Sequence, residues 1–212
     1  MIIAVDGPTA SGKGTIAKRL AAHLDVPCLD TGLLYRAVGR QVAINDGDPD
    51  SSDDAVAACD FPDALLEDDI LRTEEVGGLA SRVSVHPEVR KALFKRQRAF
   101  AEQPGGAVLD GRDIGTVIAP DADVKLFITA SVQSRAKRRW LEMIEKKLEH
   151  EEEIPLFEIE KDVVARDARD INRKDAPLKA APDALVIDTT AFDREQAFET
   201  VLEAVKQALE GR

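Results

Sequence analysis

Short continuous apolar runs alternate along the chain with longer segments in which apolar residues recur at helical spacing. The runs are rich in β-branched side chains, which is typical of strands buried on both faces of a parallel sheet. They cover residues 2–5, 26–29, 107–109, 124–128 and 185–187. Because these strands alternate with amphipathic helices, the pattern predicts an α/β fold, with a parallel sheet of about five strands and helices on both faces.

The predicted helices follow the strands closely. Ile16, Leu20 and Leu24 share one face of the first helix, and Leu34 and Val38 share one face of the second, which Asp30 or Thr31 can cap. Further helices are expected over residues 88–103, from 131 onward, over about 157–172 and over 194–209. The acidic run at 149–153 is interpreted as a solvated turn.

The pattern is weakest between residues 55 and 84, after a solvated, aspartate-rich loop at 45–54. Apolar pairs at 65–66 and 70–71 flank an acidic turn, which indicates a small hairpin, and residues 76–83 keep helical spacing despite Gly77 and Gly78. We interpret 55–84 as a compact insertion. The core of the single predicted domain then comprises residues 1–54, 85–140 and 174–212.

Between the first strand and the first helix lies the stretch GPTASGKGT. It consists of Gly7, Pro8, Thr9, Ala10, Ser11, Gly12, Lys13, Gly14 and Thr15. Its spacing matches a P-loop, in which backbone N–H groups and a helix N-terminus hold phosphate oxygens. The strand and helix on either side meet the structural requirement of the motif, so a glycine-rich turn without function is the weaker interpretation. The sequence therefore predicts a P-loop NTPase fold.

Lys13 is expected to lie on an exposed loop and to reach the β- and γ-phosphates of a nucleotide. The residue after it is Gly14, and the hydroxyl group that a P-loop uses comes one place later, at Thr15. Asp110 ends the strand at 107–109, where a Walker-B carboxylate belongs. Thr15 and Asp110 are therefore the candidate Mg²⁺ ligands, directly or through water.

Composition excludes several other classes of protein. The 212 residues carry a formal net charge of −11 at pH 7, which argues against a nucleic-acid-binding protein. Cys28 and Cys59 are too few for a disulfide framework, and no apolar run reaches membrane-spanning length. The first strand starts at residue 2, so we expect no signal peptide and a cytoplasmic protein. Three isolated histidines give little support to a zinc site or a catalytic triad.

Arginines recur in several segments that the predicted topology brings to the carboxyl edge of the sheet. Transfer of a phosphoryl group between two anionic substrates needs such permanent cations. Arg135, Arg138 and Arg139 share one helix face and would repel one another unless an anion joined them. A guanine-reading loop is not indicated, because the nearest string, at 172–175, has the wrong order.

The motifs GPTASGKGT, DTGLLYR, VRKALFKRQRAF, LDGRDIGTVIAPDADVKLF and RDARDINRKDAPL together resemble the bacterial cytidylate kinases, a family of P-loop nucleoside monophosphate kinases. The resemblance spans nearly the whole chain. It implies transfer of the ATP γ-phosphate to CMP or dCMP, with Mg²⁺, in pyrimidine nucleotide metabolism. It also implies a helical lid at about 141–165, and we expect a monomer that binds ATP and CMP or dCMP but neither nucleic acid nor membranes.

By that resemblance the P-loop holds ATP, and the groups acting in catalysis are Lys13, Arg112, Arg135, Arg139 and Arg166. The acceptor's phosphate is assigned to Arg36 and Arg112, its cytosine to Ser81, Arg90 and Arg173, and its sugar to Arg166 and Asp170. The full set implied to line the CMP site is Thr31, Tyr35, Arg36, Ser81, Arg90, Asp110, Arg112, Asp113, Arg166, Asp170 and Arg173.

The sequence departs from the family in one region, because the insertion at 55–84 is shorter than the family's usual segment. Cytosine specificity and the role of Ser81 depend on this region. Two alternatives therefore stay open: a kinase of another small acceptor, such as UMP, AMP or shikimate, and a P-loop regulator that binds nucleotide without transferring phosphate. A regulator would keep Lys13 but would not need Arg36, Arg112 and Arg173.

Overall fold

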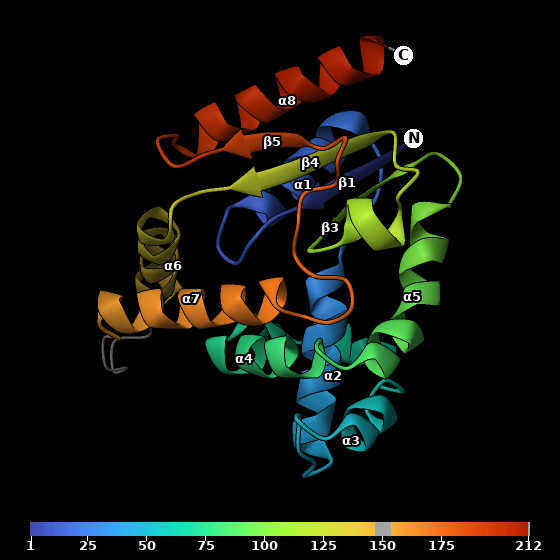
Figure 1. The fold of residues 1–212 in the computed structure, drawn as a ribbon, viewed down its shortest axis with the longest axis vertical. Helices are drawn as coiled ribbons and strands as arrows, with labels where there is room; N and C mark the ends of the chain where they lie inside the picture. The colour runs from blue at the N-terminus through green and yellow to red at the C-terminus, as the bar shows by residue number, and fades with distance from the viewer. Residues whose placement is uncertain (147–153, 212) are drawn as a thin grey trace.

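The computed structural model describes residues 1–146 and 154–211, and its centre is a five-stranded sheet in the order β2-β3-β1-β4-β5 (Figure 1). The strands are β1 (Ile2–Asp6), β2 (Cys28–Asp30), β3 (Ala107–Gly111), β4 (Val124–Thr129) and β5 (Leu185–Asp188). Every neighbouring pair is parallel. The predicted parallel α/β sheet is confirmed.

Eight α-helices are described: seven follow the predicted helical segments, and the short helix at 52–57 begins inside the segment 45–54 that was expected to be a loop. They are α1 (Lys13–Leu24), α2 (Thr31–Ile44), α3 (Ser52–Ala57), α4 (Glu74–Val83), α5 (Pro87–Ala101), α6 (Val132–Lys146), α7 (Leu156–Ile171) and α8 (Arg194–Glu210). The predicted turn at 149–153 lies outside the described residues. None of the described helices has the length and apolar character that a bilayer span requires.

Successive side chains of β1 point to opposite faces of the sheet, and each face meets a different layer. Ile3 and Val5 pack with residues of α1 and α8, whereas Ala4 packs with residues of α5 and the π-helical turn η3 (Ile114–Ile118). At the β5 edge the second face is less well covered, since Val186 is 61% exposed.

The predicted hairpin in the insertion is wrong. Two short 3₁₀ turns, η1 (Asp63–Glu67) and η2 (Asp69–Arg72), occupy that segment. The acidic turn caps a helix instead of joining strands, because the Asp68 carboxylate accepts a hydrogen bond of 2.9 Å from the Ile70 N–H. Leu71 is fully buried against the cluster formed by α2, α4 and α5, so the segment covers a helical core.

Parallel pairing brings the carboxyl ends of all five strands to one edge of the sheet. The P-loop leaves β1 at this edge, and η3 begins three residues after β3 ends there. Beyond this edge of the sheet, helices α4 and α7 contact each other, and in Figure 1 they lie side by side below the sheet. This arrangement places helix ends, strand ends and the insertion around a common space.

Candidate active site

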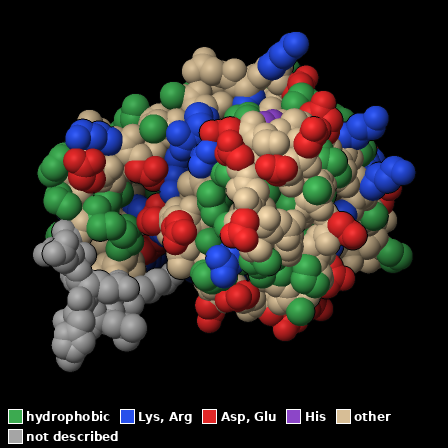
Figure 2. Space-filling model, turned by 90° about the horizontal axis from the view of Figure 1, so that it is seen from below, with side chains coloured by type: hydrophobic (Ala, Val, Ile, Leu, Met, Phe, Trp, Pro, Cys, Tyr) green, Lys and Arg blue, Asp and Glu red, His purple; other side chains and the backbone are tan. Residues whose placement is uncertain are grey.

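A cavity of about 370 Å³ occupies the space beyond the carboxyl edge of the sheet. Its lining comes from the P-loop, the ends of β2 and β3, and helices α1, α2, α4, α5, α6 and α7. Figure 2 shows Lys and Arg side chains gathered in the hollow between the smaller lobe, formed by α6 and α7, and the main body of the molecule. Although the protein as a whole is acidic, this hollow concentrates positive charge, which suits an anionic ligand.

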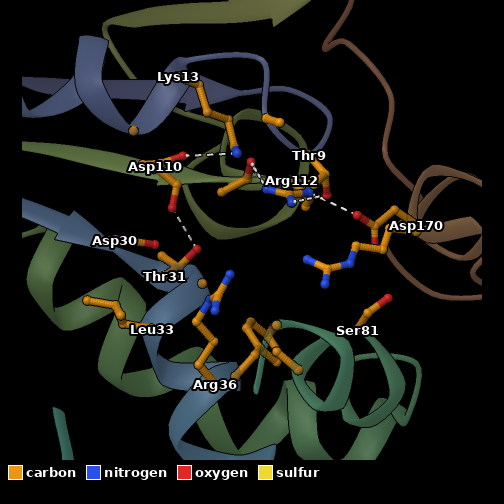
Figure 3. A pocket seen from close by; sticks show the side chains of 18 of the residues that line it. Thr9, Lys13, Asp30, Thr31, Leu33, Arg36, Ser81, Asp110, Arg112 and Asp170 are labelled. Atoms are coloured by element: carbon orange, nitrogen blue, oxygen red, sulfur yellow. Dashed lines mark hydrogen bonds and ion pairs between the residues drawn. The ribbon is translucent and has the colours of Figure 1, made fainter. Parts of the chain in front are cut away.

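The P-loop wraps the N-terminus of α1, and Lys13 is the first residue of that helix. The prediction that Lys13 lies on an exposed loop is wrong, because the residue is only 9% exposed. Its Nζ lies 3.7 Å from Asp110 Oδ1, as Figure 3 shows. Burial and the nearby Arg112 lower the pKa of Lys13, while Asp110 opposes that shift. Lys13 thus lies at the bottom of the cavity, next to a carboxylate.

The contact between α1 and Asp110 explains why a glycine follows Lys13. A Cβ at Gly14 would lie 2.9 Å from Asp110 Oδ2, so a serine or threonine at this position would push the carboxylate away. Thr15, in the next position, is exposed in the first turn of α1 and lines the cavity. The departure from the usual motif is therefore the result of close packing between the P-loop helix and β3.

The environment of the Asp110 carboxylate suits the binding of a cation. It is 5% exposed, and its Oδ1 is buried without a hydrogen-bond partner. Burial raises its pKa to about 6, although Lys13 acts in the opposite direction. Its backbone carbonyl accepts a 2.7 Å hydrogen bond from the Thr31 hydroxyl. Among the described residues, no group of three or more His, Cys, Asp or Glu side chains is placed to hold a metal ion.

Arg112 connects the P-loop with α7 across the middle of the cavity (Figure 3). Its Nε donates to Asp170 Oδ2 at 2.9 Å, and its Nη2 donates to the Thr9 hydroxyl at 3.0 Å. Asp170, assigned to the sugar from the sequence, thus pairs with Arg112. The guanidinium lies between the loop that would hold a nucleotide and the helices that would hold an acceptor.

Three further arginines of the cavity wall, Arg36, Arg139 and Arg166, lie close enough to influence one another. A Cβ at Gly77 of α4 would lie 2.8 Å from Arg166 Nη1 and 2.9 Å from Arg36 Nη2, so both guanidinium groups reach the same point. Arg36 points from α2 toward the middle of the cavity in Figure 3. Burial, followed by Arg166 and Arg139, lowers the pKa of Arg36 to about 10. Like charges are held this close most readily where an anion will lie between them.

The far end of the cavity holds Ser81, Arg90 and Arg173, which the sequence assigned to one base. Arg90 forms a buried ion pair with Asp113, and its guanidinium lies 5.6 Å from the centre of the Tyr35 ring. Arg173 is 7% exposed, and its Nη2 is buried without a hydrogen-bond partner. An unpaired buried donor is costly to maintain, so this end of the cavity is suited to a polar ligand.

Three predicted site residues do not line the cavity: Gly7, Pro8 and Arg135. Arg135 is 4% exposed and donates to Ala130 O at 2.9 Å, to Thr9 O at 2.9 Å and to Asp167 Oδ2 at 2.6 Å. Its guanidinium therefore holds the P-loop in place through Thr9 O, outside the cavity. The arginines of α6 also do not share one anion, because each has protein partners of its own. All the other predicted site residues lie on the cavity wall.

Several lining residues were missed by sequence reasoning. They include Asp30, Arg72, Glu74, Gly77, Ser84 and Glu142. Glu74 follows the Thr73 N-cap, and in sequence it looks like an ordinary acidic residue of a first helical turn. Gly77 was considered only as a weak point of the helix. Only the fold shows that α4 faces α7, so no local pattern could identify these two residues.

Comparisons with known proteins show which family the chain is similar to. The family model for cytidylate kinase matches residues 3–207. A cytidylate kinase of Caulobacter sp. (strain K31) is 51% identical over 208 residues, covering 98% of this chain and 94% of the relative. One of Rhodopseudomonas palustris (strain CGA009) is 48% identical over 215 residues, covering 100% and 99%.

Among solved structures, an uncharacterized protein from Eubacterium ventriosum superimposes with a TM-score of 0.53 at 15% identity, over 97% of this chain and 98% of that one. That likeness concerns the fold alone. The family model and the close relatives each cover nearly the full length of the sequence. The chain therefore belongs to the cytidylate kinase family.

Proposed function

We propose that this protein transfers the γ-phosphoryl group of ATP to CMP and dCMP, forming the diphosphates and ADP. The observation that carries the proposal is a single cavity with a P-loop at one end and unpaired buried donors at the other. Between the two ends lie Arg36, Arg112, Arg139 and Arg166. This order of groups matches a nucleotide donor, a phosphoryl group in transit and a nucleoside monophosphate acceptor.

ATP is assigned to residues 7–15. Backbone N–H groups of the loop and the N-terminus of α1 attract the phosphates, and Lys13 neutralises the charge that develops between the β- and γ-phosphates. Mg²⁺ fits beside Asp110, whose buried Oδ1 accepts no hydrogen bond from the described residues, with Thr15 as the second candidate ligand. When bound, the ion supplies charge neutralisation and alignment of the phosphate oxygens.

The remaining arginines hold the two reacting groups in line. Arg36 and Arg112 bind the phosphate of the acceptor, while Arg139 and Arg166 stabilise charge on the oxygens of the transferred group. Phosphoryl transfer needs little covalent chemistry from the protein, so position and permanent charge suffice. Arg135, assigned to catalysis from the sequence, acts here by supporting the P-loop through the carbonyl of Thr9.

Cytosine is assigned to Ser81, Arg90 and Arg173, with Asp113 as the nearby carboxylate. The edge of cytosine offers an N4 amino donor and two acceptors, O2 and N3. Guanidinium and hydroxyl donors match the acceptors, and a carboxylate matches the amino group. A uracil presents a carbonyl oxygen where cytosine has its amino group, so the same set would leave a buried carboxylate facing an acceptor.

We further assign residues 55–84 to the acceptor-binding insertion and 141–165 to a lid. The enzyme is proposed to act as a cytoplasmic monomer with Mg²⁺·ATP. Each nucleoside monophosphate and shikimate should be offered in turn in a coupled assay of ADP release. We expect turnover with CMP and dCMP and much less with UMP, AMP or shikimate. A preference for another acceptor would overturn the substrate, and nucleotide binding without ADP release for any acceptor would indicate a regulator.

A further inference from the structure

Glu74 has a place in the cavity that the proposed chemistry does not use. It is the first residue of α4, and its carboxylate reaches both helices of the smaller lobe. Its Oε2 lies 2.8 Å from Arg166 Nη2 of α7, and its Oε1 pairs with Arg139 Nη2 of α6. One carboxylate from the insertion therefore pairs with two arginines assigned to the transferred phosphoryl group.

The other carboxylates near these arginines are arranged differently. Glu142 pairs with Arg139, and Asp162 pairs with Arg166, and each pair lies within one helix. Such pairs do not depend on how α4 lies relative to α6 and α7. Glu74 is the carboxylate that crosses between elements, and its side chain is 28% exposed against 7% for that of Arg166. The Glu74 side chain is thus partly exposed as a whole, although its Oε1 is buried against Arg139.

We propose that Glu74 is an internal substitute for a substrate phosphate, which holds Arg139 and Arg166 until the phosphate displaces it. The inference rests on the proposed function of the cavity. The two Nη2 atoms that face a carboxylate here have the geometry to bind two oxygens of a phosphate. A phosphate carries more charge and more acceptor oxygens than a carboxylate, so it can replace Glu74 at the same donors.

Displacement has a consequence for the neighbouring elements. With Glu74 bound, α4 is tied to α6 and α7, and the repulsion among three nearby guanidinium groups is reduced. When a phosphate takes its place, the insertion and the two helices are joined through the ligand instead. Breaking the ion pairs of Glu74 reduces the net free energy of phosphate binding. A variant without this charge should therefore bind phosphate more tightly.

The test measures binding of inorganic phosphate by calorimetry at constant ionic strength, in wild type, Glu74→Gln and the control Glu75→Gln. Glu75 is exposed and lies in the same helical turn, so the control removes the same charge from the same helix end. We expect Glu74→Gln to lower the dissociation constant about tenfold and the control to change it by less than about twofold. Equal or weaker binding by Glu74→Gln would overturn the inference, because it would mean that Glu74 only orients the arginines.

Glu74→Asp keeps the charge and shortens the side chain, so it decides the question if Glu74→Gln does not fold. A shorter carboxylate cannot bridge both arginines, and we expect this variant to bind phosphate more tightly than wild type does. Phosphate affinity identical to wild type would contradict the proposal. The KM for CMP should fall in parallel with the phosphate constant. If the phosphate constants change as expected but no acceptor gives ADP, the proposed function fails while the competition by Glu74 stands.

Discussion

Gly77 determines how closely two arginines approach each other. Its missing side chain leaves room for Arg36 Nη2 and Arg166 Nη1, each within 3 Å of where a Cβ would lie. Gly77→Ala should therefore displace both guanidinium groups and raise the KM for CMP at least about tenfold, by analogy with the cost of misplacing a reacting group by about 1 Å. Steady-state kinetics with CMP measure this effect.

The adjacent Gly78 provides the matched control, because a Cβ there would meet no atom within 4 Å. Both substitutions replace a glycine in a helix, so each should stabilise α4 by up to about 1 kcal/mol. We expect Gly78→Ala to raise the free energy of unfolding and leave CMP kinetics unchanged. Equal kinetic losses in the two variants would show that flexibility of α4, and not room for the arginines, is what matters.

Arg173 tests the assignment of the base. A surface ion pair with Asp170 or Asp175 was the alternative role, but the residue is 7% exposed, and within the described part of the chain its side chain donates to a backbone carbonyl, Asp170 O at 3.3 Å, and not to a carboxylate. Arg173→Met should cost on the order of 2–4 kcal/mol in kcat/KM for CMP, because the base edge loses its charged donor, with the KM for ATP little altered. Kinetics with CMP and UMP give the answer: equal losses would show that Arg173 does not read the base, and no loss with either would remove it from the site.

Asp6 joins two elements beneath the P-loop. At the end of β1 its carboxylate accepts hydrogen bonds of 2.8 Å from the N–H groups of Ile114 and Gly115 in η3. Burial raises its pKa from 3.8 to about 7, although these two donors oppose the shift. Between about pH 4 and about pH 7, Asp6 therefore keeps its proton in the folded state and has lost it in the unfolded state. The contribution of Asp6 to the free energy of unfolding falls as the pH rises through this range.

The variant Asp6→Asn cannot ionise and should lack this dependence. We expect the free energy of unfolding of wild type to fall relative to that of the variant between pH 4 and 7, by a few kcal/mol at most, since one pKa unit corresponds to about 1.4 kcal/mol. Urea denaturation at several pH values measures the difference. Parallel curves for the two proteins would show that the donors of η3 keep Asp6 ionised throughout.

Local pattern was enough to predict most elements and part of the site. All five strands and the long helices follow from period and β-branched content, and the P-loop follows from spacing and its flanks. The hairpin was wrong because four apolar residues around an acidic turn also suit two 3₁₀ turns on a helical core. The burial of Lys13 and the inward role of Arg135 depend on partners distant in sequence, Asp110 and Thr9, which no local pattern contains.

At the scale of the molecule, the cavity is divided between the P-loop core, to which ATP is assigned, and two helices, α6 and α7, that reach it from the side. Transfer to an acceptor instead of water requires the site to close, and the arginines of α6 and α7 need phosphates opposite them. With CMP and a non-hydrolysable ATP analogue bound together, we expect slower amide hydrogen exchange over residues 154–164 than with either ligand alone. The amides of α8, on the far face of the sheet, serve as the control. Unchanged exchange at 154–164 would contradict closure by this lobe.

Helix α6 also carries the one tryptophan of the sequence, Trp140, which is next to Arg139. Its indole packs against the small cluster of Ala136, Ile159 and Val163, and it is only partly buried. Indole emission depends on exposure to water, and the other aromatic residues of the chain emit weakly beside it. The protein thus contains its own optical probe where α6 and α7 of the smaller lobe pack together. Stopped-flow emission with ATP, with CMP and with both would place each movement of that lobe in time, without any label attached to the chain.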